Sequence, residues 1–390
     1  MRHTYSTITP AAVRDTAHAA LRRALPWAPY RRSVPVTALL DLLLLAAALG
    51  SSLWAVARRF AFGFSHETAR KALDANLPDP DALAGGLVDA LHGLVPRAFT
   101  RRPRDVALDR HDAPFYGKPG TPGVLGGPKK GGTNRAFAYA TACAVHRGQR
   151  WCLGLAPLAD GDPEAAVRAV VAQLLARGVR VRSLILDRGF FSGHVILALQ
   201  RLGVPFVVGV PRKGGRWDAL FAMPSGKVVR HAWRTERGNR PVAVSVVRAC
   251  RRVRGRWRRE VYAFGGVDAG RAAGRYARAR HYRGLMRRRF GIETSYRQMN
   301  QGKARTTTKD PRRRLLWLGV ALLLRQAWVW LQRALAGRRT RYERWRPDGR
   351  LTLAVLLGWL AGAVRGRHPD VREIPLPHPV TLPLDAQANR

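Results

Sequence analysis

Acidic residues and cysteines are scarce in this sequence. Asp and Glu number 25 against 69 Lys and Arg, which gives a formal net charge of +44, and only eight of the basic residues are lysines. The three cysteines, Cys143, Cys152 and Cys250, form no CxxC pair, so neither a zinc site nor a disulfide framework is indicated, and a reducing cytoplasm is expected. A chain this basic repels itself unless a polyanion neutralises it, and nucleic acid is the polyanion expected. The alternative is a basic protein that acts through general charge alone.

Three apolar stretches raise the question of membrane insertion. Residues 37–57 are long enough to span a bilayer, but Asp41 lies within them. Residues 315–336 carry Arg325 in their middle, where a charge is costly in lipid, and residues 351–364 are too short. We therefore expect helices buried in a protein that does not enter the membrane.

Composition divides the chain into regions with different expected structures. The predicted regions are a helical N-terminal DNA-binding domain (1–100), the first part of a catalytic core (101–210), an inserted β-rich subdomain (211–275), the second part of the core (276–340), and a C-terminal helix with a Pro-rich tail (341–390). The predicted fold class is α/β, with a mixed sheet in the core.

The N-terminal region has the outline of a helix-turn-helix. Helices are predicted at 37–49 and 51–60, and Ser65 is expected to cap a third one that carries Arg70 and Lys71. A Gly-containing turn followed by a basic helix is typical of DNA recognition, although a plain helical bundle would show the same pattern.

The centre of the chain alternates β-prone and helical segments. Strands are predicted at 106–109, 135–145, 149–158, 183–187 and 205–210, with helices at 163–177 and 192–202. Three strands, helix, strand, helix and strand is the element order of an RNase H-like fold, with an antiparallel meander followed by parallel strands joined through right-handed crossovers. Two more helices are expected at 278–301 and 314–336.

Two aspartates stand at matching places in this predicted sheet. Asp109 ends the first predicted strand and Asp187 ends the fourth. In an RNase H-like sheet these strands are neighbours, so both carboxylates would emerge at the same edge. The alternative is that each Asp caps a turn. Asp112, which follows the first strand, is the competitor to Asp109.

A third carboxylate is expected on the long helix that follows the insertion. Glu293 lies among arginines, with Arg289 four residues before it and Arg297 four residues after it. Carboxylates are the ligands that Mg²⁺ prefers, and two such ions can cut and rejoin phosphodiester bonds. The alternative is a surface ion pair of little energetic weight. The tryptophans of the insertion, Trp217, Trp233 and Trp257, would either stack on unpaired bases or pack in a core.

Three motifs together resemble a known enzyme family. LDRHDAPFYG (108–117), ILDRGFFSG (185–193) and YRGLMRRRFGIETSYRQ (282–298) resemble the DDE transposases of bacterial and archaeal insertion sequences, in the IS-four group. The resemblance covers about residues 100–335. It implies an RNase H-like catalytic core with a β-rich insertion before the catalytic Glu. It also implies that Asp109, Asp187 and Glu293 are the catalytic and metal-binding triad, and that Arg289 is the signature arginine that contacts DNA phosphate.

The match is incomplete at two signature positions. Met286 stands where the group has a tyrosine, and Asn300 stands where it has a lysine, with Lys303 further along the chain. These departures concern how DNA strands are handled, including base flipping and hairpin formation, and not the metal triad.

The resemblance implies a complete set of partners. It implies two Mg²⁺ ions per active site, with Mn²⁺ as a substitute, and double-stranded DNA in the form of terminal inverted repeats and target DNA. It further implies a dimer in the synaptic complex and a cytoplasmic, nucleoid-associated location in a prokaryote. The residues expected to bind DNA are Arg289, Arg297, Lys303, Arg188, Arg70 and Lys71. The alternatives are an RNase H-like nuclease without strand transfer and a non-catalytic, domesticated DNA-binding relative.

Overall fold

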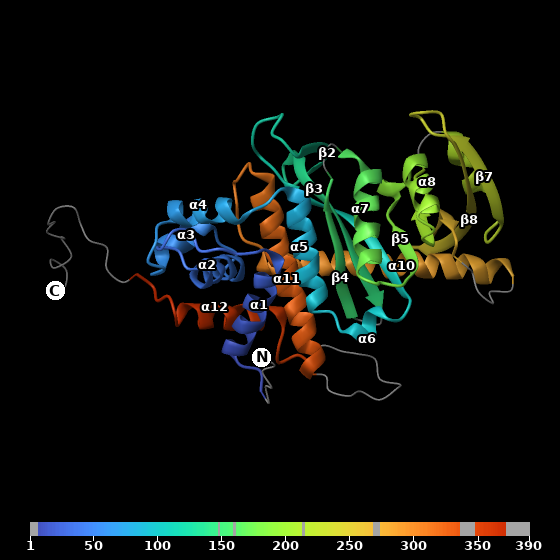
Figure 1. The fold of residues 1–390 in the computed structure, drawn as a ribbon. Helices are drawn as coiled ribbons and strands as arrows, with labels where there is room; N and C mark the ends of the chain where they lie inside the picture. Colours follow the sequence, from blue (N-terminus) through green and yellow to red (C-terminus); the bar gives the residue numbers. More distant parts are fainter. Residues whose placement is uncertain are drawn as a thin grey trace, which may run out of the picture.

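A computed structural model gives the fold over most of the chain. It describes residues 7–146, 149–158, 161–212, 215–267, 274–335 and 348–371. The Pro-rich tail predicted near the C-terminus lies outside the described residues. Figure 1 shows helices of the N-terminal region packed at one end of a large sheet.

Six helices precede the first strand: α1 (Pro10–Ala24), α2 (Val36–Ala48), α3 (Leu53–Arg59), α4 (His66–Asn76), α5 (Pro80–Gly93) and α6 (Arg97–Thr100). The three helices predicted in this region are confirmed as α2, α3 and α4. Serines begin two of them, because the hydroxyl of Ser52 accepts a hydrogen bond from the Ala55 amide and that of Ser65 accepts one from the Thr68 amide. The C-terminal helix α12 (Leu353–Arg365) packs on α1 and α2.

One mixed sheet of nine strands forms the centre of the molecule. Its strands are β1 (Arg104–Pro114), β2 (Val124–Lys130), β3 (Thr133–His146), β4 (Gln149–Pro157), β5 (Val181–Leu186), β6 (Phe206–Gly209), β7 (Val228–Arg234), β8 (Pro241–Val253) and β9 (Arg256–Gly265). The strand order is β2-β3-β1-β5-β6-β9-β8-β7, and β4 pairs with β3. β1 is antiparallel to β3 and parallel to β5, as the predicted RNase H-like fold requires.

The strands of the predicted insertion continue this sheet. β9 pairs antiparallel with β6, β8 pairs with β9, and β7 forms the outer edge. The region between β6 and the last long helices therefore extends the catalytic sheet sideways rather than forming a second sheet. A short helix, α9 (Asp218–Ala222), precedes these strands.

Helices cover both faces of the sheet (Figure 1). α7 (Pro163–Ala176) and α8 (Gly193–Arg201) follow β4 and β5, whereas α10 (Arg275–Met299) and α11 (Pro311–Leu335) follow β9. Successive residues of β3 distinguish the faces, since side chains alternate along a strand. On one face, Thr141 contacts Tyr296 of α10. On the other face, Ala142 lies beside Gly154 of β4, where an added methyl group would meet Val170 of α7.

α11 is the described helix that is long and apolar enough to cross a membrane by length and composition. The candidate span is Pro311–Arg333, and 94% of its most apolar window is buried inside the protein. α2 and α3 would make a second span only as a pair bent by 112°. Arg325, in the middle of α11, donates to the carbonyl of Arg150 at 2.7 Å, so its charge lies against protein backbone.

Gln326 fixes α11 to its neighbours, and its replacement is expected to destabilise the fold. Its amide nitrogen donates to the carbonyls of Leu91 and Cys152 at 2.9 and 3.0 Å, and its oxygen accepts from the Cys152 amide at 2.8 Å. We expect Gln326→Leu to lower the free energy of unfolding by about 2 kcal/mol, because buried backbone groups lose their partners. Urea denaturation measures this. Gln200→Leu on the exposed face of α8 is the control, and an equal loss there would contradict the explanation.

Candidate active site

Asp109 on β1 lies beside Asp187, which directly follows the neighbouring strand β5. The parallel pairing of β1 with β5 ends at Leu108 opposite Leu186. Asp109 is therefore the next residue along β1, and Asp187 is the residue that follows β5. The predicted strand end at Asp109 is wrong, since β1 continues to Pro114 by pairing with β3. β5 is the strand that stops, and the side chain of Asp109 lies on the face of the sheet that α10 covers, 3.1 Å from Arg289.

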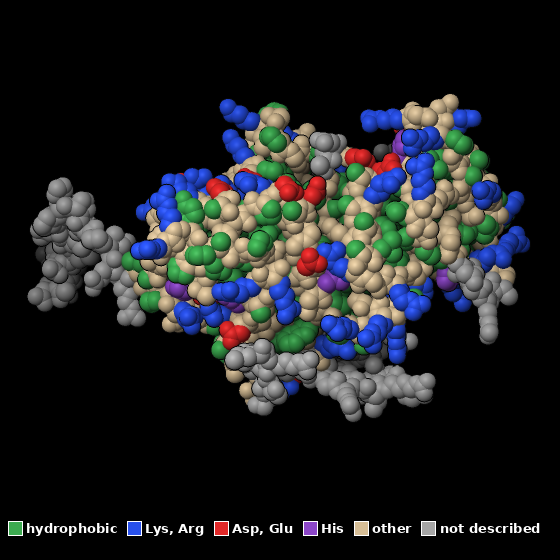
Figure 2. Space-filling model, viewed as in Figure 1, with side chains coloured by type: hydrophobic (Ala, Val, Ile, Leu, Met, Phe, Trp, Pro, Cys, Tyr) green, Lys and Arg blue, Asp and Glu red, His purple; other side chains and the backbone are tan. Residues whose placement is uncertain are grey.

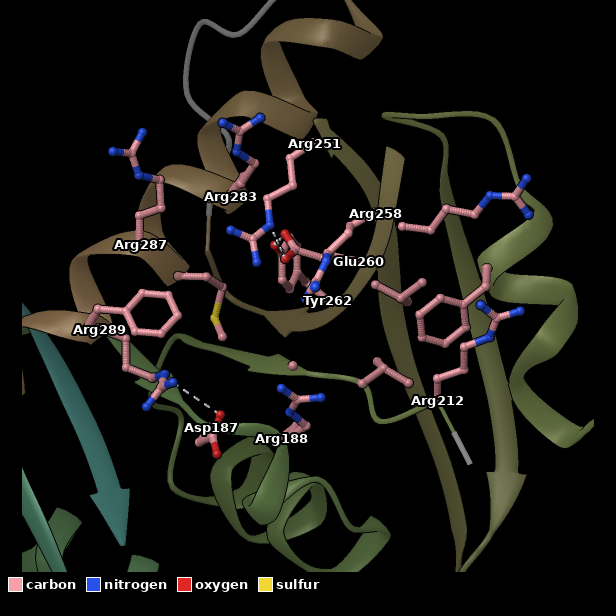
Figure 3. A pocket seen from close by; sticks show the side chains of 17 residues that line it. Asp187, Arg188, Arg212, Arg251, Arg258, Glu260, Tyr262, Arg283, Arg287 and Arg289 are labelled. Atoms are coloured by element: carbon pink, nitrogen blue, oxygen red, sulfur yellow. Dashed lines mark hydrogen bonds and ion pairs between the residues drawn. The ribbon is translucent and has the colours of Figure 1, made fainter. Parts of the chain in front are cut away.

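The guanidinium of Arg289 joins three carboxylates. One of its terminal nitrogens lies 3.1 Å from Asp109 Oδ2, and the other lies 3.3 Å from both Asp187 Oδ1 and Glu293 Oε1. Arg289 and Glu293 are one turn apart on α10, so the same face of this helix supplies the cation and the third acid. Figure 3 shows Arg289 reaching from α10 toward Asp187. The structure therefore brings together the three acids predicted from the sequence.

The site has a closed side and an open side. The side chains of Arg289 and Asp109 are 7% and 12% exposed, whereas those of Asp187 and Glu293 are 36% and 41% exposed. Asp109 is thus the buried carboxylate of the site, and the carboxylates of Asp187 and Glu293 are accessible to solvent and to a substrate.

Burial changes the acidity of Asp109. Its pKa is raised to about 6, chiefly by desolvation, and the charges of Asp187 and Glu293 raise it further, while Arg289 acts in the opposite direction. An acid with this pKa is present in both protonation states near neutral pH.

Asp112 does not join the three acids. It is three residues beyond Asp109, so the pleat of β1 turns its side chain to the other face of the sheet. There it accepts a hydrogen bond of 2.6 Å from Nε of Arg110. By position, Asp109 is the acid of the site and Asp112 is a partner of a surface arginine.

Tyr296 supplies a contact that its sequence position did not reveal. Its hydroxyl is hydrogen-bonded to that of Thr141 and donates to the backbone carbonyl of Asp109 at 3.4 Å. Its ring lies 4.9 Å from that of His111. Burial raises the pKa of Tyr296, so the hydroxyl remains protonated and fixes α10 to β1 beside Asp109. Its spacing of three residues from Glu293 was the available signal.

The residues predicted to bind DNA are divided between two places. Arg188 lines a cavity beside Asp187, as does Met286, which stands at the signature tyrosine position. Arg297 is exposed on α10, and Lys303 is half-buried just after it. Arg70 and Lys71 lie on α4, which is at the other end of the molecule from α8 in Figure 1, and Arg70 is paired with Glu67.

The tryptophans of the insertion have different environments. Trp217 and Trp233 are half-buried and pack against each other and against Phe191, with ring centroids 5.3 to 5.9 Å apart. Trp257 is 71% exposed near the β8–β9 turn. The first two have the packing role that was one of the alternatives.

The three acids fit a divalent cation by type and by convergence. Carboxylate oxygens are the ligands of hard cations, and since Asp187 Oδ1 and Glu293 Oε1 each lie 3.3 Å from one nitrogen, they are at most twice that distance apart. Within the described residues, no three His, Cys, Asp or Glu side chains already stand at metal-ligand spacing. The guanidinium of Arg289 lies between the three acids and would have to move for them to share an ion.

Comparisons with known proteins identify a family and a similar fold. The family model described as "Transposase DDE domain" matches residues 101–325. A comparison with curated proteins finds no match. Among solved structures, the fold is similar to that in a cryo-EM structure of the piggyBac transposase synaptic complex with hairpin DNA, with 11% sequence identity and a TM-score of 0.54 over 93% of this chain and 82% of that chain. At this identity the likeness concerns the fold alone.

Proposed function

Since this chain belongs to the transposase DDE domain family, and is thus an enzyme of DNA transposition, we propose that Asp109, Asp187 and Glu293 hold the metal ions with which it cuts DNA. The observation that carries the assignment is the contact of all three carboxylates with the single guanidinium of Arg289. These acids come from β1, from the residue after β5, and from α10, and Asp187 and Glu293 are 106 positions apart in a chain with few acids.

When bound, divalent metal ions would activate the nucleophile and would stabilise the leaving oxygen during phosphodiester cleavage. We propose that the ions are Mg²⁺, with Mn²⁺ as a substitute, and that each site takes two. Asp109 would hold them from the closed side, and Asp187 and Glu293 from the side that DNA approaches. Before metal binds, Arg289 keeps the three carboxylates together, and the hydrogen bond between Tyr296 and Thr141 joins α10 to β3 beside the site.

We propose that the DNA partner is double-stranded, and arginines line a cavity beside Asp187. Figure 2 shows Lys and Arg side chains spread over the visible face, with few Asp and Glu between them. We propose that the substrates are the terminal inverted repeats of an insertion sequence and a target DNA, and that Arg188, Arg297 and Lys303 contact the DNA near the site. Arg289 would reach DNA phosphate only after leaving the carboxylates.

The helices before β1 are proposed to bind DNA at a distance from the site. In this proposal residues 1–100 form a helical DNA-binding domain in which α4 presents Lys71 and Arg70. Strand transfer joins two element ends to one target, so we propose a dimer in the synaptic complex. The proposed setting is the nucleoid of a prokaryotic cytoplasm.

In vitro cleavage tests the proposed function. The purified protein is incubated with Mg²⁺ or Mn²⁺ and a DNA that carries the sequences flanking its own gene. We expect nicks or breaks at fixed positions in inverted repeats, followed by joining of the 3′ ends to a second DNA. Cleavage without joined products would favour a nuclease, and binding without cleavage would favour a non-catalytic relative.

Metal binding is expected to weaken below the pKa of Asp109. Because that pKa is raised to about 6, the carboxyl is largely ionised above pH 6 and must release a proton before it binds a metal ion below that pH. We expect Mn²⁺ affinity, measured by calorimetry, to fall by up to about tenfold per pH unit below 6 from this group alone. Asp109→Asn is the control and should bind Mn²⁺ weakly with a flatter pH dependence. A wild-type affinity that stays constant from pH 7 to pH 5 would contradict the explanation.

A further inference from the structure

Asp105 is the most deeply buried acid of β1 and is separate from the three acids of the site. Its side chain is 1% exposed, against 12% for that of Asp109. The two aspartates are four residues apart on one strand, a distance of roughly 13 Å, and each contacts an arginine of α10. The strand that carries Asp109 thus holds a second buried carboxylate, too far away to share its metal ions.

The carboxylate of Asp105 is bound by side chains from β5 and from α10. Arg182 of β5 donates to it through Nε at 2.8 Å and through a terminal nitrogen at 2.6 Å, and the hydroxyl of Ser183 donates to it at 2.8 Å. A terminal nitrogen of Arg288 on α10 lies 3.3 Å away. One acid therefore joins β1, β5 and α10, which are the same three elements that position the carboxylates of the site.

Asp105 also lies where the register between β1 and β5 is set. The pairing passes over Arg182, so that Asp105 lies opposite Ser183, and the side chains of both these β5 residues bind Asp105. From this point the two strands run in an even register, and four residues later they bring Asp109 beside Asp187. A slip of one residue turns the side chains of a strand to the other face, so this register decides whether the two aspartates meet.

Asp105 stays ionised under conditions in which Asp109 takes up a proton. Burial acts to raise the pKa of Asp105, but the hydrogen bonds from Arg182 and Ser183 and the charge of Arg288 bring that pKa below its ordinary value. Asp109 is also buried, and its pKa is raised to about 6. The ion pairs of Asp105 therefore hold the three elements together across the pH range in which the site itself titrates.

The contacts of Asp105 do not depend on the position of Arg289. Arg289 lies between the three carboxylates of the site and has to leave them before they share a metal ion. Its departure removes the side chain that holds these acids together. The attachment at Asp105 uses other side chains, so it remains in place when Arg289 moves.

We propose that Asp105 is a positioning residue for DNA cleavage, which keeps β1, β5 and α10 in the arrangement in which their acids bind metal once Arg289 has moved. The inference rests on the proposed function, which assigns metal binding to those acids. Asp105 acts through Arg182, Ser183 and Arg288. Small displacements matter here, because a misplacement of about 1 Å can lower a rate by roughly a hundredfold.

Single-turnover cleavage by Asp105→Asn tests the proposal, with Mn²⁺ affinity measured by calorimetry. The amide keeps the shape of the side chain and removes the charge that binds Arg182 and Arg288. We expect the cleavage rate at saturating DNA to fall by about 10- to 100-fold, and Mn²⁺ to bind about tenfold more weakly. The DNA concentration that gives half the maximal rate should stay that of the wild-type chain, because Asp105 is buried and is not a DNA contact.

Asp310→Asn is the matched control. Asp310 is a half-buried acid that also binds arginines, but its partners Arg312 and Arg313 lie on α11, which carries none of the three acids. At a temperature at which both variants are folded, this control should keep the wild-type cleavage rate and Mn²⁺ affinity. An equal loss in Asp310→Asn would overturn the proposal, as would a folded Asp105→Asn that cleaves and binds Mn²⁺ as the wild-type chain does.

Arg288→Gln tests the contact with α10, including the case in which Asp105→Asn does not fold. The side chain of Arg288 is 47% exposed, so its replacement should leave the chain folded. It should slow cleavage at an unchanged half-saturating DNA concentration, and the combined variant should be no slower than Asp105→Asn alone, because both changes remove one contact. A wild-type rate in Arg288→Gln, or effects that multiply, would contradict the proposal.

Asp187→Asn in the same assay separates this proposal from the metal assignment. If Asp187→Asn cleaves as the wild-type chain does, the assignment of the three acids has failed. If Asp187→Asn is inactive while Asp105→Asn is unaffected, the positioning role of Asp105 alone has failed.

Discussion

Asp187→Asn is expected to reduce metal-dependent DNA cleavage by about a thousandfold or more, and Glu293→Gln is expected to do the same. Metal ions stabilise the transition state of phosphodiester cleavage by several kcal/mol, and each lowering of the barrier by about 1.4 kcal/mol raises the rate tenfold. Each amide keeps the shape of the side chain and removes one negative ligand from a set of three. Both side chains are more than a third exposed, so neither replacement should disturb the fold.

Single-turnover cleavage of end-containing DNA in Mg²⁺ and in Mn²⁺ is the measurement, with DNA binding followed in parallel. Asp112→Asn is the control. It also removes an acid from β1, but the side chain of Asp112 lies on the other face of the sheet, where it pairs with Arg110. The control should cleave like the wild-type chain. Full activity of either triad variant, or equal loss in Asp112→Asn, would show that the acids are wrongly assigned.

Arg289→Gln is expected to lower the free energy of unfolding by about 3 kcal/mol when no divalent metal is present. Arg289 and Asp109 form a buried pair, and breaking such a pair costs roughly 3–5 kcal/mol because the remaining charge is uncompensated. The lower end applies here, since the contacts with Asp187 and Glu293 are partly exposed to solvent and Asp109 can take up a proton.

Added metal should then stabilise the variant more than the wild-type chain. Without Arg289 between them, the three carboxylates are free to bind a cation, and a ligand that binds only the folded state raises its stability. Thermal unfolding in EDTA and in Ca²⁺, which supports binding without requiring cleavage, measures both effects. Arg297→Gln, an exposed arginine one turn beyond Glu293, is the control and should change neither value. Equal responses of the two variants to Ca²⁺ would contradict this role of Arg289.

Much of the catalytic sheet follows from local sequence patterns. The predicted strand 183–187 and helix 163–177 correspond to β5 and α7, which end within one residue of the predicted ends, because long apolar or amphipathic runs are strong local signals. β2 was not predicted, since Gly126, Gly127 and Pro128 give it little tendency to form a strand. It exists because β3 offers a pairing partner.

The choice between Asp109 and Asp112 shows where local reasoning ends. Both are acids near the end of an apolar run, and the sequence could place either one at the sheet edge. The extension of β1 to Pro114 depends on pairing with β3, from a separate part of the chain. Once that pairing is known, the alternation of side chains turns Asp109 toward α10 and Asp112 away from it.

By itself, the sequence determined that this protein is basic, that its elements follow the order of an RNase H-like core, and that three acids stand at positions that resemble a transposase triad. Only the tertiary structure decided that Arg289 holds all three acids, that Tyr296 fixes β1 to α10, and that β8 and β9 join the catalytic sheet to form an arginine cavity beside Asp187. The reason is physical: periodicity and turn residues act over a few neighbours along the chain, whereas strand pairing joins residues tens of positions apart and the ion pairs of Arg289 with Asp109 and Asp187 join residues more than a hundred positions apart.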